Sequence, residues 1–543
     1  MPGTISLVCY SSQVLRIDKS AWLLVVLSAA LQILIFPLPN LYILCWMAIA
    51  PLLVALLRAR QPDTLQIRAG IKLLPARPLQ AFLLAYSCGV IWYAGTCYWI
   101  YNTMRQYGGV SAPAAVGILI LFCLYLAIYH GVFGLLISLL AGSSPFSRRA
   151  LLLAPAMWVA VELARTRITG FPWDLIGIAQ VDNIPLAHVT TFTGVYGLSF
   201  EIMVVNAALA AAFLIRREQR KFLLLAALGS AVVLQAGLWL VPPLLPSDHS
   251  ARLVQENIPI LQGTEWTKEY FDDTLSDLTR ISLSPSSNQQ RQTDLIVWPE
   301  SPAPFYTTDP IFREAVSNIA RKAQTWVLAG SVGTRNAGQS PQGVTQSYNS
   351  AALVNPRGEW VGRYDKMHLV PFGEYVPFKS IFGFAGGLSK EVGDFSPGES
   401  RAPLQADGNS LGVFICYESI FPDEVRQLAA NGAQVLVNIS NDGWYGDSGA
   451  YAQHLKQARM RAVENNRWLL RDTNTGVTAS IDPYGRIAAG APRKIRTAVD
   501  APYAVSNVTT FYSRHGDWFA YLCAIISAGA LLARLPFRVR TEP

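Results

Sequence analysis

Charged side chains are scarce in this sequence. Asp, Glu, Lys and Arg make up only 15% of the 543 residues, while hydrophobic residues make up 51%. Because an average globular chain carries about 25% charged residues, this composition is typical of a membrane protein. The net charge of +8 does not predict nucleic-acid binding, since Lys and Arg cluster beside apolar runs and form no basic stripe with interleaved aromatic residues.

Paired cysteines are also absent. The seven cysteines include no CxxC motif and no paired spacing, so the sequence indicates neither a disulfide framework nor a zinc site. No metal or organic cofactor is implied. Cys416 alone lies in the long polar region, whereas the other cysteines lie in apolar segments or in the N-terminal tail. A free cysteine is often a small core residue, but a lone one can also be a nucleophile.

Hydrophobic runs, by contrast, are numerous. Crossing a bilayer as a helix takes roughly 20 apolar residues. The first run follows Arg16 and Lys19 as in a signal peptide, but the runs after it favour a retained helix. The fifth run is shorter and contains Glu162. We predict an α-helical bundle of about eight transmembrane spans, at 21–38, 41–57, 81–101, 112–141, 150–164, 192–215, 222–241 and 517–534.

Basic residues between the spans predict the topology. Lys and Arg cluster after the second, fourth, sixth and eighth spans, and the alternate loops hold few. The positive-inside rule therefore places both termini in the cytoplasm and the long region after the seventh span in the periplasm. We predict an N-terminal membrane domain with about seven helices (1–244), a periplasmic domain (245–510), and a C-terminal transmembrane helix with a cytoplasmic tail (511–543).

The outer region has the pattern of an α/β fold. Short β-type runs, such as 294–301 (DLIVWPES) and 411–418 (LGVFICYE), alternate with helix-like stretches such as 309–324 and 449–466. Strands that alternate with helices predict a layered sheet with helices packed on it.

Three polar residues stand where predicted strands give way to loops: Glu300, Lys366 and Cys416. Ligands in open α/β sheets usually bind at such strand ends. A carboxylate, an ammonium and a thiol brought together there form a nucleophilic site. In such a site the carboxylate takes the thiol proton and the ammonium stabilises a tetrahedral oxyanion. Spacing alone leaves alternatives open, in which Glu300 is a surface ion-pair residue and Lys366 a solvated turn lysine.

Two histidines are weaker candidates. His368 follows Lys366 by two residues and allows a Cys–His dyad, but nothing in its context marks it as a base. His454 is interpreted as an exposed or packed helix residue.

Several motifs resemble a known family. VWPES (297–301), YDKMHLVPFGEYVP (364–377) and ICYES (415–419) are similar, in this order, to the Glu, Lys and Cys segments of the nitrilase (carbon–nitrogen hydrolase) superfamily. Placed between membrane spans, they resemble the apolipoprotein N-acyltransferases of Gram-negative-type bacteria. The likeness extends to QENIP, SNDGWYGDSGA and the segment 461–487, and so covers essentially the whole chain. QENIP and NDGWYG differ by a residue or two from the expected forms.

The resemblance implies a fold and a catalytic triad. The outer domain is expected to be a nitrilase-like α-β-β-α sandwich. Glu300 is implied as the general base, Lys366 as the oxyanion-stabilising residue and Cys416 as the acyl-accepting nucleophile.

The resemblance also implies a supporting set of residues. Its members are Glu374, which orients or polarises the site; Tyr417 and Glu418, beside the nucleophile; and Trp266 and Trp444, near the substrate pocket, for which simple packing is the alternative. We expect the Tyr417 N–H to share the oxyanion with Lys366 and Glu418 to hold the site rather than to transfer a proton. The segment 372–391, rich in Phe and Gly, is interpreted as a flexible arm that admits acyl chains, with an ordinary buried loop as the alternative.

The implied reaction is a ping-pong acyl transfer in the bacterial inner membrane. The expected donor is a phospholipid, phosphatidylethanolamine in particular, and the expected acceptors are diacylglyceryl apolipoproteins. A membrane-tethered amidase or nitrilase with the same triad is the first alternative. A transporter or receptor is the second, and it requires paired ionisable residues in the spans, for which Glu162, His130 and His188 are the candidates.

Overall fold

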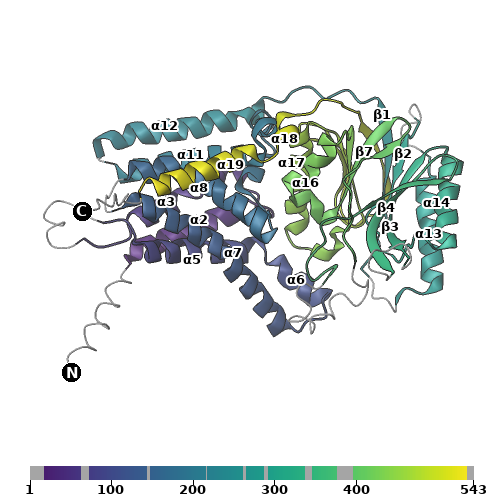
Figure 1. Cartoon of the computed structure of the whole chain (residues 1–543), viewed down its shortest axis with the longest axis horizontal. Coiled ribbons are helices and arrows are strands. Elements are labelled where there is room, and N and C mark those ends of the chain that lie inside the picture. The colour runs from purple at the N-terminus through teal and green to yellow at the C-terminus, as the bar shows by residue number, and fades with distance from the viewer. Residues whose placement is uncertain are drawn as a thin grey trace, which may run out of the picture.

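The computed structural model describes residues 17–62, 73–142, 147–215, 217–260, 265–285, 292–301, 303–336, 345–375 and 395–534. These residues form two parts that lie side by side (Figure 1). One part is a helical region built from the first half of the chain and the last helix, and the other is a sandwich of two β-sheets between layers of helices.

Helices occur within all eight predicted spans. The main ones are α2 (Lys19–Leu34), α3 (Ala50–Leu57), α5 (Pro78–Thr96), α6 (Trp99–Gln106), α7 (Ala112–Ala141), α8 (Arg148–Ala164), α11 (Val195–Leu214), α12 (Arg217–Gln235) and α19 (Trp518–Leu532). Short turns connect them: η1 (Tyr42–Trp46), η2 (Arg165–Thr169), η3 (Ile176–Gln180), α9 (Ile184–Ala187), α10 (Thr190–Thr193), η4 (Ala236–Trp239) and α18 (Phe511–His515).

Fewer helices than predicted are long enough to cross a membrane by themselves. Among the described residues, three helices meet the length and hydropathy of a span: Ala112–Ala141, Val195–Leu214 and Gln219–Trp239. A fourth is reached if α5 and α6, which are bent by 51° at their junction, count as one span. Lys19–Leu34, Tyr42–Leu57 and Trp518–Leu532 are apolar but shorter. Length and composition alone therefore leave the prediction of about eight spans unconfirmed.

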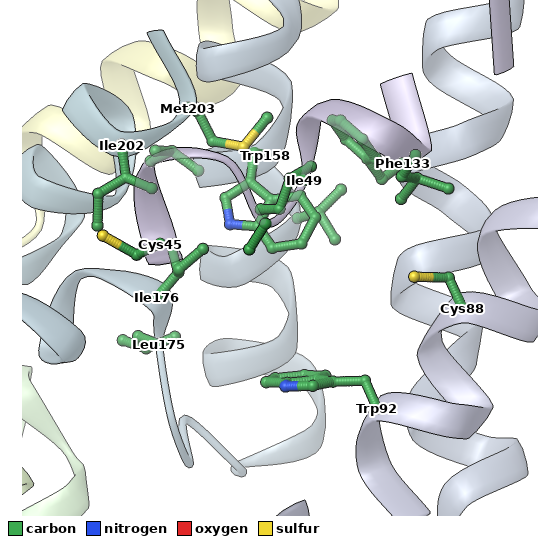
Figure 2. Packing of buried hydrophobic residues seen from close by; sticks show 14 of the residues in the cluster. Cys45, Ile49, Cys88, Trp92, Phe133, Trp158, Leu175, Ile176, Ile202 and Met203 are labelled. Carbon is green, nitrogen blue, oxygen red and sulfur yellow. The ribbon is translucent and has the colours of Figure 1, made fainter. Parts of the chain in front are cut away.

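The helical region has a continuous hydrophobic core. Figure 2 shows side chains from several helices in this core, among them Trp92 of α5, Phe133 of α7 and Trp158 of α8. Small residues let two of the helices approach closely. A Cβ atom on Gly134 of α7 would lie 2.4 Å from the carbonyl oxygen of Ala81 in α5, so only glycine fits at this crossing.

The sandwich consists of two six-stranded sheets. The first has the order β12-β1-β2-β3-β4-β5 and the second β11-β10-β9-β8-β7-β6. The central pairs β1–β2, β2–β3, β7–β8 and β8–β9 are parallel, and the outer pairs are antiparallel. The strands are β1 (His249–Gln255), β2 (Leu295–Val297), β3 (Trp326–Arg335), β4 (Gln346–Val354), β5 (Trp360–Asp365), β6 (Leu404–Ala406), β7 (Asn409–Ile415), β8 (Val435–Ser440), β9 (Leu469–Thr473), β10 (Thr478–Ile481), β11 (Ile487–Ala491) and β12 (Thr497–Tyr503).

Alternation along the strands builds separate hydrophobic layers. Leu295 and Val297 of β2 point into the core between the sheets, while Ile296 joins the outer cluster. In β7, Val413 lies between the sheets and Phe414 lies outside. Successive side chains of a strand face opposite sides, so strands that are apolar at every position are buried on both faces.

Helices cover both outer faces of the sandwich. α13 (Lys268–Ser282) and α14 (Pro310–Ala323) cover the first sheet, and α16 (Pro422–Ala430) and α17 (Ala450–Asn465) cover the second. In Figure 1, α16 and α17 lie between the sheets and the helical region, and α13 and α14 lie on the far side. The predicted nitrilase-like α-β-β-α architecture is therefore confirmed.

Specific polar contacts join the two parts. Gln453 of α17 accepts a hydrogen bond from Trp173 Nε1 at 2.7 Å and donates to the carbonyl oxygens of Pro37 at 2.9 Å and Thr96 at 3.3 Å. The sandwich therefore packs directly on the ends of α2 and α5.

Candidate active site

The three predicted residues follow the C-terminal ends of three strands. β2, β5 and β7 end at residues 297, 365 and 415, so Glu300, Lys366 and Cys416 lie in or begin the loops that follow. All three residues are at most 7% exposed. The Glu300 loop crosses very close to Gly330 of β3. A Cβ atom on Gly330 would lie only 1.8 Å from the Pro299 carbonyl oxygen, so only glycine fits there.

Glu300 and Lys366 belong to one buried polar network. Lys366 Nζ donates to Glu374 Oε1 at 3.0 Å and to Glu300 Oε1 at 3.3 Å. Asn349 Nδ2 lies 2.7 Å from both of these carboxylate oxygens. The second oxygen of Glu300 accepts from the Asn441 N–H at 2.7 Å. The network therefore holds two carboxylates around one ammonium group.

Cys416 stands at a strained turn beside this network. Its φ angle of 49° lies in the left-handed region, which non-glycine residues rarely adopt and which tends to occur at functional sites. It begins the 3-10 turn η8 (Cys416–Ile420).

The electrostatics of the site favour a protonated thiol and a charged lysine at rest. Burial and then the charge of Glu300 raise the pKa of the Cys416 thiol well above its usual range, although Lys366 acts in the opposite direction. Burial works to lower the pKa of the Lys366 ammonium, but the carboxylates of Glu374 and Glu300 outweigh burial and hold this pKa above its usual value. The thiol therefore needs a base before it can react.

The raised thiol pKa predicts how Cys416 reacts with iodoacetamide as pH changes. Below the pKa, the thiolate fraction rises about tenfold per pH unit. We therefore expect the alkylation rate to rise steadily from pH 7 to pH 9 without a plateau. The measurement is mass spectrometry of the Cys416 peptide, with Cys416→Ser reporting the background from the other cysteines. A plateau near pH 7 would show that the thiol pKa is lowered rather than raised.

Glu418 ties the loop after Lys366 to the turn at Cys416. Its Oε1 accepts from the N–H groups of Met367 at 2.8 Å and His368 at 3.1 Å, and its Oε2 from the Ile415 N–H at 2.6 Å. The Tyr364 hydroxyl lies 2.9 Å from Oε1. With these bonds made, the carboxylate is 2% exposed, which supports the predicted holding role over proton transfer.

The side chains of Tyr417 and His368 contact groups other than the triad. The Tyr417 hydroxyl donates to the Gly170 carbonyl oxygen of the helical region at 3.2 Å. His368 Nδ1 lies 2.9 Å from Glu424 Oε1, and its ring stacks on Phe421 with centroids 3.8 Å apart. These contacts hold the His368 ring against Glu424 and Phe421 and lend no support to the Cys–His dyad.

The two predicted pocket tryptophans lie in different surroundings. Trp266 packs against Tyr270, with ring centroids 5.1 Å apart, and against the hydrophobic cluster under α13 and α14. Trp444, in the turn η9 (Asp442–Tyr445), packs edge-on against Tyr107, and its carbonyl oxygen accepts from Thr103 Oγ1 at 2.9 Å. Substrate contact by either tryptophan stays a prediction. The predicted arm, 372–391, lies outside the described residues beyond 375.

The sequence analysis missed Asn349 altogether, and it interpreted His454 only as an exposed or packed helix residue, of which the structure shows the packed form. Asn349 bridges Glu300 and Glu374, and its only signal in the sequence is an amide in an otherwise apolar strand. His454 is completely buried, and its Nε2 lies 3.1 Å from the Cys416 carbonyl oxygen. The described residues contain no cluster of three or more His, Cys, Asp or Glu side chains suited to a metal ion.

Comparison with known proteins places the chain in a family. Residues 28–208 match the profile of the apolipoprotein N-acyltransferase N-terminal domain, and residues 251–510 match that of the carbon-nitrogen hydrolases. The apolipoprotein N-acyltransferase of Geobacter metallireducens is 34% identical over 531 residues, which cover 96% of each chain. The chain belongs to the apolipoprotein N-acyltransferase family.

A second relative agrees with this family, and a solved structure is also similar. The apolipoprotein N-acyltransferase of Methylococcus capsulatus is 36% identical over 476 residues, covering 85% of this chain and 89% of the relative. A carbon-nitrogen hydrolase structure from Helicobacter pylori is 18% identical, covers 47% of this chain and 88% of its own, and has a TM-score of 0.33. The resemblance to apolipoprotein N-acyltransferases expected from the motifs is confirmed.

Proposed function

We propose that this member of the apolipoprotein N-acyltransferase family moves an acyl chain from the sn-1 position of a phospholipid to the N-terminal α-amine of an S-diacylglyceryl-cysteine apolipoprotein. A thioester on Cys416 is the intermediate. The observation that carries the proposal is the meeting of Glu300, Lys366 and Cys416 in one buried site, in a chain whose relatives bear the name of this reaction.

In the first step Cys416 takes the acyl group. Glu300 accepts the thiol proton while Sγ bonds to the ester carbonyl carbon, and Lys366 Nζ and the Tyr417 N–H stabilise the oxyanion. The intermediate then collapses and its ester C–O bond breaks. Glu300 gives the proton to the departing glycerol oxygen, which leaves as a lysophospholipid. The acyl chain remains as a thioester.

In the second step the lipoprotein amine takes the acyl chain. The α-amine, in its neutral form, bonds to the thioester carbon while Glu300 accepts a proton from its nitrogen. The C–S bond breaks, the proton returns to Cys416 Sγ, and an N-acyl amide forms. Glu374 holds Lys366 through the 3.0 Å bond from Nζ in both steps. Because both substrates are lipids, phosphatidylethanolamine being the proposed donor, the enzyme needs its membrane helices as well as the triad.

We propose a bacterial inner-membrane topology with about eight spans. Support comes from the helix ends that contact the sandwich. Some helices contact it with their C-terminal end, and helices between them in the chain contact it with their N-terminal end, as expected of a chain that crosses back and forth. Contacts with the sandwich are made by Pro37 after α2, Tyr42 before α3, Thr96 after α5, Arg167 after α8, Val195 of α11 and Pro242 after α12. On the opposite side, the Asp18 N–H donates to the Ala59 carbonyl oxygen, and Ser138 Oγ to that of Ala76, at 2.7 Å each.

The same arrangement supports the proposed sidedness and domains. The described basic residues of the loops rich in Lys and Arg, among them Arg58, Arg77, Arg148 and Arg220, stand at the helix ends away from the sandwich (Figure 1), which the positive-inside rule makes cytoplasmic. The sandwich, within 245–510, is then periplasmic, and 1–244 and 511–543 hold the membrane helices. Protease added to intact spheroplasts should cut the sandwich. Cutting only after the membrane is made permeable would show the reverse orientation.

Labelling with a donor lipid tests the reaction. The purified protein is incubated in mixed micelles with a phospholipid labelled in its sn-1 chain. We expect a hydroxylamine-sensitive label on the wild type and on the control Cys523→Ala, and none on Cys416→Ala. A diacylglyceryl peptide should then receive the label, whereas water alone should not remove it quickly. An unlabelled wild type, or a labelled Cys416→Ala, would contradict the proposal.

A further inference from the structure

His454 of α17 contacts the turn that carries the nucleophile. Its Nε2 lies 3.1 Å from the Cys416 carbonyl oxygen and 2.7 Å from Ser419 Oγ. Its Nδ1 lies 3.0 Å from Asp442 Oδ1 and 3.1 Å from Arg471 Nη2. These residues lie outside the triad, and the steps described above do not use the His454 side chain.

We assign a proton to Nε2 of the His454 ring, the nitrogen that faces the Cys416 carbonyl oxygen. A backbone carbonyl oxygen only accepts hydrogen bonds, so the bond to Cys416 requires a proton on Nε2. Two states supply this proton. In the imidazolium, Nδ1 also donates to Asp442; in the neutral Nε2–H tautomer, Nδ1 accepts from Arg471 Nη2. The Ser419 hydroxyl can accept as well as donate, so it is compatible with both states.

The ring cannot easily turn away from the carbonyl. Trp173 of the helical region stacks on it at 5.9 Å with an interplanar angle of 11°, and Tyr445 packs edge-on at 5.5 Å. Asp442 is fixed in turn by Arg471 Nη2 at 2.8 Å and by Ser440 Oγ at 2.8 Å. His454 itself has no exposed surface.

The Cys416 carbonyl and the Tyr417 N–H belong to one peptide unit. The peptide is planar and trans, so its C=O and N–H groups point in opposite directions. Fixing the carbonyl toward His454 therefore fixes the N–H on the opposite side. A donor on the carbonyl also polarises the unit, because chained hydrogen bonds strengthen one another. Tyr417 is the second residue of η8, so the turn's own hydrogen bonds do not use its N–H.

We propose that His454 is a positioning residue for acyl transfer. Its bond to the Cys416 carbonyl aims and polarises the peptide so that the Tyr417 N–H binds the oxyanion. The inference rests on the proposed function, because it explains how one of the two proposed oxyanion donors is held. The same hydrogen bond stabilises the left-handed conformation of Cys416, which is strained for a residue other than glycine.

Two nearly isosteric variants test this role. His454→Met removes the donor and His454→Gln keeps an N–H that can reach the carbonyl. We expect His454→Met to form the acyl-enzyme roughly tenfold to a hundredfold more slowly than the wild type, somewhat less than the loss of a whole oxyanion donor. His454→Gln should recover most of that rate. Alkylation of Cys416 by iodoacetamide passes through no oxyanion, so its rate should stay within about threefold in both variants.

The two rates separate the possible outcomes. If His454→Met loses acylation and alkylation equally, the role of His454 is purely structural. If the Gln and Met variants acylate at the same rate, the hydrogen bond from Nε2 to the Cys416 carbonyl does not matter. Either result overturns the inference. A wild type that is alkylated but never acylated would instead overturn the proposed function.

If the His454 variants do not fold, the Ser419→Ala variant tests the inference instead. This variant removes the Ser419 hydroxyl from His454 Nε2 but keeps the Cys416 carbonyl oxygen as the acceptor of the Nε2–H. Its acylation rate should therefore match that of the wild type. A tenfold lower rate would overturn the inference.

Discussion

Glu300→Gln is expected to form the acyl-enzyme on the order of 10²–10⁴ times more slowly than the wild type, the usual contribution of a positioned general base. The amide cannot take the thiol proton, and burial keeps the pKa of Cys416 high, so little thiolate forms without that base. Rapid-quench labelling with the sn-1-labelled phospholipid measures the rate.

The same substitution also disturbs the hydrogen bonds of the site. Glu300 accepts from Asn349, Lys366 and Asn441, and the amide nitrogen of glutamine must face one of these donors. We expect a loss of about 1–3 kcal/mol in the free energy of unfolding. Glu314→Gln is the matched control, because its side chain is 65% exposed and pairs with Arg321. Acylation by Glu300→Gln within threefold of the control would rule out Glu300 as the base.

Lys366→Met is expected to lose both activity and stability. Lys366 is 1% exposed and lies between Glu300 and Glu374. Its removal leaves two buried carboxylates without a counterion, and breaking a buried pair in this way costs about 3–5 kcal/mol. Loss of the oxyanion donor should slow acyl-enzyme formation by a further factor of roughly 10²–10³. Thermal unfolding in detergent and the labelling assay measure the two effects.

A double variant separates these two effects. Lys366→Met with Glu374→Gln removes one of the two facing charges, so we expect its thermal midpoint to recover toward the wild type while acylation stays low. Lys268→Met, whose side chain is 82% exposed, should change neither quantity. If activity returned together with stability in the double variant, Lys366 would be a structural residue and another group would bind the oxyanion.

The positions of Glu300, Lys366 and Cys416 at strand ends could be predicted because their signal is local. A short run of β-type residues that stops at a polar or reactive side chain can be recognised from adjacent residues alone. Glu300, Lys366 and Cys416 each follow such a run. Asn349 and His454 gave no such signal. Asn349 sits in a strand interior, and its partners Glu300 and Glu374 come from loops distant in the sequence.

The membrane helices show a different limit of the sequence. Hydropathy located a helix in every predicted span, because apolar side chains must leave water wherever they lie. It did not decide how many cross a bilayer. α5 and α6 bend by 51°, and Lys19–Leu34 and Trp518–Leu532 are shorter than an ordinary span. Bends and helix ends depend on neighbouring helices and on the sandwich, which a window of residues does not contain.

The sequence alone was therefore enough to predict the α/β class of the outer domain, the strand ends at Glu300, Lys366 and Cys416, and the family. These follow from side-chain periodicity and from motifs of a few adjacent residues. Only the tertiary structure decided that Glu374 and Asn349 complete the Lys366 network, that Glu418 joins two loops, and that His454 contacts the Cys416 carbonyl oxygen. Hydrogen bonds act over about 3 Å, and only folding brings groups so far apart in the chain within that distance.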